Sequence, residues 1–166
     1  MQITKSASAT LAIALFLTVV LPAQEQKPLI SAPIPPQIVS AKRVFISNAG
    51  TTLASLYAFK QLGGADRPYN QFYQAMKTWG RYELAPSPAE ADLVFEIRFT
   101  DPYANDGRGP LFQLSILDTK THFTLWAISE PIQSAAFKSN FEKNFNQGMD
   151  RFMDDIKKLS SPSVGQ

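Results

Sequence analysis

The segment from Leu93 to Thr100 constrains the fold most, because apolar and polar residues alternate along it without a break. Successive side chains of a β-strand point to opposite faces of the sheet. One face would carry Leu93, Phe95, Ile97 and Phe99, and the other Val94, Glu96, Arg98 and Thr100. An apolar face opposite a mixed face predicts an antiparallel sheet that is covered on one side only.

Two more strands are expected directly after this one. Apolar residues alternate again from Leu111 to Leu117, and a further β-rich run extends from Thr124 to Glu130. The polar residues from Asp118 to His122 between them predict a tight reversal. Pro131 ends the last strand. The pattern therefore predicts a three-stranded meander.

The chain before the meander predicts two short strands and a helix. A β-rich run from Lys42 to Ser47 ends in a turn signal at 48–50, and Arg81 to Ala85 forms the second strand. Between them, Asp66 is a candidate N-cap, Pro68 suits a first helical turn, and Gly80 is a stop signal. Aromatic and apolar side chains repeat on one face of this helix, at Tyr69, Phe72, Tyr73, Met76 and Trp79. We expect a partly ordered loop at 51–66.

A second, longer helix is expected from about Ala135 to Leu159. Its apolar residues recur every three or four positions, at Phe137, Phe141, Phe145, Met149, Phe152, Ile156 and Leu159. The whole pattern predicts a two-layer α+β domain at 41–160, with a mostly antiparallel sheet of about five strands and two helices packed on one face. Residues 161–166 should form a disordered tail.

The N-terminal segment has the layout of a secretory signal peptide. Basic Lys5 precedes the apolar run from Leu11 to Leu21, and polar residues follow Ala23. The expected signal peptide is 1–23, with cleavage between Ala23 and Gln24. The product would be exported, and periplasmic or secreted. An uncleaved leader is the alternative, in which case the chain would stay attached to the membrane.

Four prolines mark residues 24–40 as an extended tether, namely Pro28, Pro33, Pro35 and Pro36. Proline fixes φ and lacks an amide donor, which favours extended conformations. A spacer is the plain interpretation, and a proline-motif ligand for a partner is the alternative.

Composition excludes several functions. The chain has no cysteine, so it has no disulfide, thiol nucleophile, thiolate zinc site or lipidated N-terminal cysteine. Its 16 basic and 14 acidic residues include no run of Lys and Arg longer than two. Nucleic-acid binders concentrate basic residues in a stripe, so we expect no nucleic-acid partner.

The sequence contains few candidates for catalysis. His122 is the single histidine and lies in a predicted turn, and no nucleophile elbow or phosphate-binding motif is present. Asp101, Asn105 and Asp106 share one loop, but their spacing does not match a calcium-binding loop. We therefore expect no cofactor and no metal.

Three stretches together resemble a known family, namely Phe72–Leu84, Ala91–Ile97 and Leu117–Trp126. They are similar to small exported bacterial domains of unknown function. The layout of these domains resembles envelope α/β modules such as the amino-terminal domain of TolB and the curli secretion component. Members are often lipoproteins. This chain differs from them because it has no cysteine to carry a lipid. The resemblance implies that the Ala91-Asp92 pair and the hairpin Trp126 serve packing and turns.

The predicted open face is the candidate interaction surface, with Glu96, Arg98, Gln113 and Ser115. The sequence favours a non-enzymatic binding or adaptor module that acts on an unknown component of the cell envelope. The alternative is a hydrolase of an envelope or extracellular substrate. It would use Glu96 and Glu130 as paired carboxylates on the open face, or Asp101.

Overall fold

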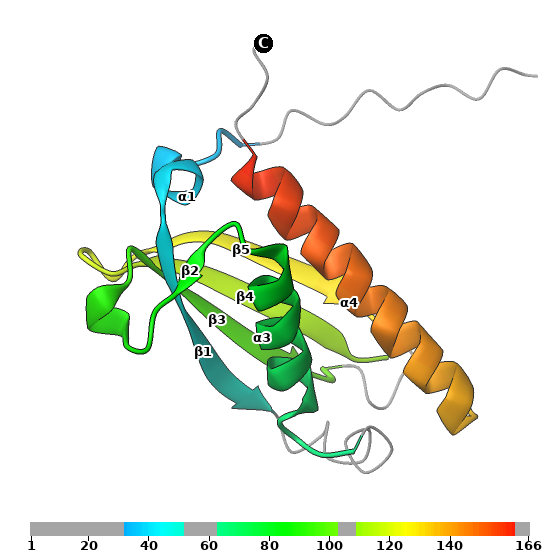
Figure 1. The fold of residues 1–166 in the computed structure, drawn as a ribbon. Coiled ribbons are helices and arrows are strands. Elements are labelled where there is room, and N and C mark those ends of the chain that lie inside the picture. The colour runs from blue at the N-terminus through cyan, green and yellow to red at the C-terminus, as the bar shows by residue number, and fades with distance from the viewer. Residues whose placement is uncertain (1–31, 52–62, 103–108, 162–166) are drawn as a thin grey trace, which may run out of the picture. The chain divides into compact units, whose positions relative to one another are not determined.

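A sheet covered by helices on one side forms the folded part of the chain (Figure 1). The structure, a computed structural model, describes residues 32–51, 63–102 and 109–161. Its strands are β1 (Arg43–Thr51), β2 (Glu83–Leu84), β3 (Leu93–Thr100), β4 (Leu111–Asp118) and β5 (Thr124–Pro131). Its helices are α1 (Pro36–Ser40), α3 (Arg67–Trp79) and α4 (Lys138–Ser160), with the 3-10 turn η2 at Pro88–Glu90. None of these described helices is long and apolar enough to cross a membrane.

The five strands are arranged in the order β2-β1-β3-β4-β5. β3, β4 and β5 form the predicted antiparallel meander, whereas β1 runs parallel to both β2 and β3. The parallel pairing of β1 with β2 requires a crossover, which α3 supplies. The structure confirms the α+β class with a five-stranded open sheet.

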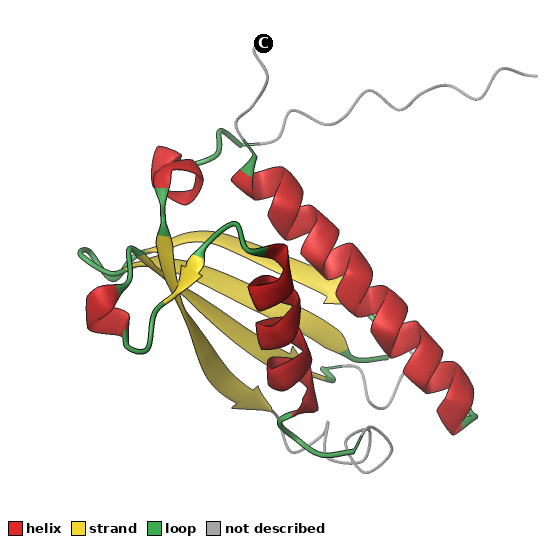
Figure 2. Ribbon diagram, viewed as in Figure 1, coloured by secondary structure: helices red, strands yellow, loops and turns green. Residues whose placement is uncertain are grey.

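Both long helices lie on the same face of the sheet (Figure 2). The core between the layers is built from aromatic rings that are fully buried, namely Phe72, Phe95, Phe112, Phe145 and Phe152. Phe112 of β4 contacts two rings of α4, with centroid separations of 5.0 Å to Phe145 and 5.5 Å to Phe152. The predicted apolar face of β3 is buried in this core.

Helix α3 begins and ends where the sequence predicts. Pro68 lies in its first turn, and Gly80 ends it in the left-handed conformation at φ 67°. Asp66 occupies the N-cap position but makes no side-chain capping bond. Its Oδ1 instead accepts a hydrogen bond from Asn48 Nδ2 at 3.3 Å.

Helix α4 differs from the prediction at its start. Phe137 was expected on the apolar stripe, but it precedes the first helical residue and is 72% exposed. Its backbone is extended (φ −100°, ψ 137°), so its side chain does not follow the helical repeat. The other residues of the stripe are buried, from Phe141 to Leu159.

The last part of the expected tether is folded against the domain. Residues 36–40 form α1, and Ile38 at its centre is completely buried. Arg81 donates to Val39 O at 2.7 Å, and the Tyr82 hydroxyl donates to Ile38 O at 3.1 Å. The compact unit therefore begins at Pro33 rather than at residue 41. Pro36 starts this helix, because proline fits a first helical turn.

Strand β1 is longer than expected and β2 is shorter. The predicted turn at 48–50 is an irregularity within β1, where Gly50 has φ 75° and its N–H donates to Asn48 Oδ1 at 2.9 Å. Residues 52–62 of the expected loop lie outside the described residues, as do 103–108 of the connection before β4.

Candidate binding face

The face of the sheet opposite α3 and α4 brings the four predicted interaction residues together. Register places Glu96 of β3 opposite Ser115 of β4, and Arg98 opposite Gln113. The next strand adds Ala127 beside Ser115 and Ser129 beside Gln113. We call this surface the open face. Directly opposed residues on neighbouring strands point to the same side, so these six form two adjacent rows.

The two rows line a shallow depression of about 210 Å³, whose walls are Glu96, Arg98, Gln113, Leu114, Ser115, Ala127, Ile128 and Ser129. A depression of this size is too small for a typical drug-sized ligand, which occupies roughly 300–1,000 Å³. It suits a protruding side chain or a small polar group.

Arg98 differs from the other described arginines because its guanidinium has no hydrogen bond, ion pair or ring contact within the described residues. Arg43 and Arg67 form ion pairs with glutamates, Arg81 bonds two carbonyl oxygens, and Arg151 bonds Glu130. Glu96, two residues from Arg98 on the same face, likewise has no partner among those residues. Unpaired charges beside each other on one face are available to a ligand.

Apolar side chains border this polar band along the strands. Phe45, Val94 and Leu117 form the row on one side by register, and all three are half-buried. Leu111, also half-buried, lies in the row on the other side, opposite Thr100. The open face therefore combines unpaired charges with half-buried apolar side chains.

The carboxylate pair that the alternative hydrolase hypothesis places on the open face does not form. Glu130 lies opposite Phe112, whose ring is in the core, so Glu130 points to the helix-covered side. There Arg151 of α4 donates to its Oε1. Glu96 and Glu130 are therefore on opposite faces of the sheet. The sequence contained a signal for this position. Glu130 lies two and four residues after Ile128 and Trp126, so all three side chains point to the same face of β5.

The remaining catalytic candidates are dispersed. Asp101 follows the end of β3, and Asn105 and Asp106 lie outside the described residues. His122 is exposed in the hairpin between β4 and β5, with φ 62°. Within the described ranges, no three side chains of the metal-binding types come together.

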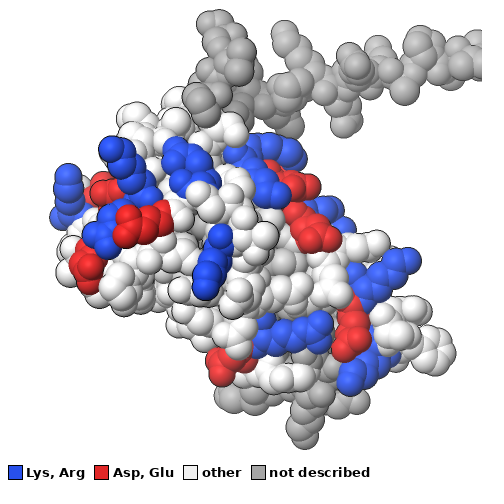
Figure 3. All heavy atoms as spheres, viewed as in Figure 1, with Lys and Arg blue, Asp and Glu red and all other residues white. Residues whose placement is uncertain are grey.

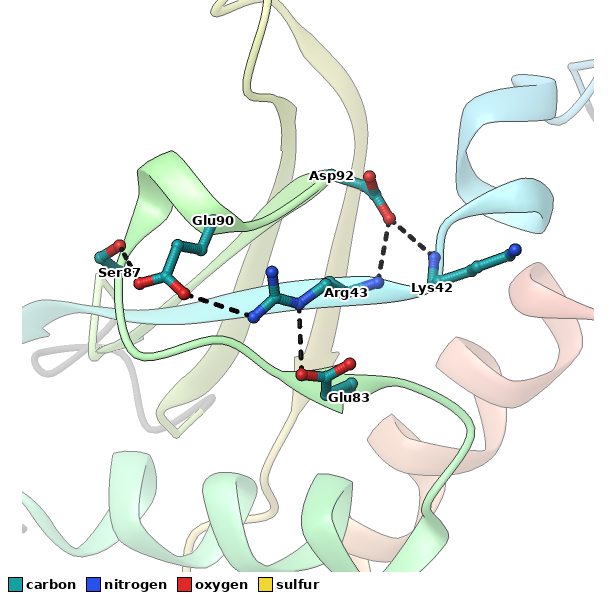
Figure 4. Close-up of polar contacts among 6 residues, drawn as sticks. All are labelled: Lys42, Arg43, Glu83, Ser87, Glu90 and Asp92. Carbon is teal, nitrogen blue, oxygen red and sulfur yellow. Dashed lines mark hydrogen bonds and ion pairs between the residues drawn. The ribbon is translucent and has the colours of Figure 1, made fainter.

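A second charged cluster lies at the start of β1 (Figure 4). Arg43 forms ion pairs with Glu83 of β2 at 3.3 Å and Glu90 of η2 at 3.4 Å. Asp92 Oδ2 accepts the backbone N–H groups of Lys42 and Arg43 at 2.8 and 2.9 Å. These contacts fasten β2 and η2 to β1. The charged side chains of Arg43, Glu83, Glu90 and Asp92 all have partners within the domain, which indicates a structural role.

A wider hollow of about 570 Å³ separates α3 from α4 on the other side of the molecule. Three of its polar side chains are engaged, since Gln71 donates to Asn146 and Lys157 pairs with Asp154. Basic and acidic side chains are interspersed over this side (Figure 3). The open face is therefore the better candidate, because its charges are unsatisfied.

Comparison with known proteins does not assign a family. No family model matches the chain, and no curated protein matches it. One similar solved structure is a Helicobacter pylori protein described as a homologue of a neuraminyllactose-binding hemagglutinin. It is 12% identical, with 74% of this chain and 87% of that chain covered and a TM-score of 0.43.

Two further solved structures are bacterial lipoproteins. An uncharacterised lipoprotein of Nitrosomonas europaea is 9% identical, covering 79% of this chain and 89% of its own, with a TM-score of 0.33. A lipoprotein of Neisseria meningitidis is 11% identical, covering 68% and 99%, with a TM-score of 0.32. All three TM-scores lie below 0.5, so these likenesses carry no argument about the function of this chain.

Proposed function

We propose that this chain is an exported, non-enzymatic binding module of the bacterial cell envelope, and that its open face binds the partner. The observation that carries the proposal is the unpaired Arg98 and Glu96 at a depression on the uncovered side of the sheet. Most charged side chains elsewhere in the described residues have partners within the domain. An acidic group of a partner could form with Arg98 the charge-assisted hydrogen bonds that its guanidinium lacks within the described residues.

Export is supported by the sequence of the first 23 residues. The binding role is supported by the dispersal of the carboxylates. A general acid and base must project into one cleft, whereas Glu130 is held by Arg151 on the far side of the sheet. The open face instead offers unpaired charges beside half-buried apolar side chains, which a protein partner of complementary charge could contact.

Site-specific photocrosslinking tests the open face directly. Because the chain has no cysteine, a Gln113→Cys variant carries a single attachment point for a thiol-reactive photocrosslinker. A matched control, Lys77→Cys, places the same probe on an exposed residue of α3. In envelope extracts we expect a discrete adduct from position 113 and none of the same mass from position 77.

The charge of Arg98 should decide whether that adduct forms. Adding Arg98→Glu to the Gln113→Cys protein should abolish the adduct, because it leaves two neighbouring carboxylates facing the partner's acidic group. Adding Lys77→Glu should not. An adduct at position 113 that survives Arg98→Glu, or that forms equally from position 77, would contradict the proposed function.

A further inference from the structure

We propose that β5 is a docking edge for a second copy of this chain, which joins two sheets in antiparallel fashion about a two-fold axis at Ile128. This inference goes beyond binding at the open face, because the dimer needs no other ligand. It rests on the asymmetry of the two sheet edges, the direction of the β5 amides, and the position of the exposed apolar residues.

The two edges of the sheet are protected to different degrees. Edge strand β2 has two residues and is held by the Arg43–Glu83 ion pair. Edge strand β5 has eight residues, and its single charged side chain, Glu130, is engaged by Arg151. Soluble proteins protect edges with short strands, lysine or proline. β5 has Pro131 at its last position, the inward-pointing Glu130 and a register shift against β4 near its start, but it contains no lysine, and no proline before its last position.

The backbone of β5 presents unpaired groups outward. Ile132 N donates to Pro110 O at 2.8 Å. This bond shows which residues of β5 direct their N–H and C=O groups toward β4. Alternate residues then bond to β4, among them Ile128 and Glu130. The N–H and C=O groups of Ala127 and Ser129 consequently point away from the sheet. They are the donors and acceptors that an added strand would use.

Exposed apolar residues flank both ends of this strand. Among the described residues, two large hydrophobic side chains are exposed, Phe123 at 73% and Phe137 at 72%. Phe123 directly precedes β5, and Phe137 follows it after six residues. In an antiparallel pair, the start of each β5 lies beside the end of the other. Phe123, just before the start of β5 in one copy, therefore lies near the end of β5 in the other copy. From that end the other chain continues to its Phe137.

Antiparallel pairing with a second copy places compatible side chains opposite each other at this edge. An axis at Ile128 sets Ala127 of each copy opposite Ser129 of the other, so small side chains meet on the open face. It sets Glu130 opposite Trp126 of the other copy, so no like charges oppose each other. Because Ala127 and Ser129 line the depression, pairing would join the two depressions into one groove.

Mass measurement on the purified chain from residue 24 onward tests the dimer. Sedimentation equilibrium over a wide range of concentration should give twice the chain mass for the wild type. Ala127→Pro removes an outward N–H and leaves the bonds to β4 intact, so it should give the monomer mass. Ser129→Lys adds a charge to the same edge and should do the same. The control Gln147→Lys, on the exposed side of α4, should remain dimeric.

A wild type that is monomeric throughout would overturn the proposal, as would a dimer that persists in a folded Ala127→Pro or Ser129→Lys protein. Circular dichroism establishes folding, and if Ala127→Pro unfolds, Ser129→Lys decides. Failure here would leave the open-face proposal intact, because that proposal is read from the Arg98-dependent adduct.

Single cysteines test the register. Opposed residues of a hydrogen-bonded antiparallel pair have Cα atoms about 5.5 Å apart, which is within disulfide range. A mixture of Ala127→Cys and Ser129→Cys proteins should therefore form a disulfide-linked dimer under mild oxidation faster than either protein alone. Equal or faster crosslinking by either protein alone would contradict an axis at Ile128.

Discussion

At the scale of single residues, two aspartates secure the ends of the central strands. Asp92, directly before β3, accepts the N–H groups of Lys42 and Arg43. Asp118, at the end of β4, accepts the N–H groups of Lys120 and Thr121, both at 2.8 Å. Hydrogen bonds to the ionised carboxylate favour that form. The N–H donors of Arg43 and Lys42 lower the pKa of Asp92, and those of Thr121 and Lys120 lower the pKa of Asp118.

These lowered pKa values predict that the protein loses stability in acid. The stabilisation is fully present above the ordinary aspartate pKa of about 3.9 and is lost as pH falls through the folded values below it. The free energy of unfolding, measured by urea denaturation across this range, should fall toward low pH. Asp92→Asn combined with Asp118→Asn should flatten that fall, whereas Asp150→Asn on the exposed side of α4 should leave it unchanged. An unaltered slope in the double variant would refute this role.

At the scale of elements, α4 approaches the sheet closely at a single glycine. Gly148 is buried in mid-helix, and a Cβ there would lie 3.0 Å from Ile132 Cγ1 and 3.5 Å from Phe112 Cε2. Glycine weakens a helix interior by about 1 kcal/mol relative to alanine. Its presence here is explained by the close packing of Ile132 and Phe112 against the helix.

A larger side chain at this position should force the two layers apart. Gly148→Leu is expected to lower the free energy of unfolding by about 1–3 kcal/mol through overpacking. Gln147→Leu, one residue earlier on the exposed side of α4, should change it by less than about 0.5 kcal/mol. Thermal and urea denaturation of both variants provide the comparison. Equal effects would show that position 148 is not packed against the sheet.

The sequence predicted those elements whose periodicity reflects burial. The bounds and the buried face of β3 agree with the prediction, because the apolar residues alternate in a strand that is covered on one face. The open-face residues follow from the same alternation. Parallel pairing of β1 with β3 was not predictable, because it depends on contacts distant in the chain. Helix α1 was missed because its five residues contain only one full turn, and the prolines around it are typical of extended chain.

At the scale of the whole molecule, the domain is larger than the sequence indicated. The compact unit starts at Pro33, so the expected tether 24–40 includes residues that belong to the fold. Ile38 packs into the core cluster, and Arg81 and Tyr82 bond the carbonyl groups around it. Deleting the whole of 24–40 would therefore damage the domain together with the spacer. A test of the tether must leave α1 in place.

Two truncated chains separate the spacer from the domain. A chain that begins at Pro33 should be as stable as one that begins at Gln24, because it keeps α1 and the described contacts of α1 with the domain. A chain that begins at Lys42 loses the fully buried Ile38, and burial of such a side chain stabilises by about 1.5–3 kcal/mol. Urea denaturation should show this difference, and Ile38→Ala in the longer chain should reproduce most of it. If the chain beginning at Lys42 were as stable as the other two, α1 would lie outside the cooperative unit, and residue 41 would be its true boundary.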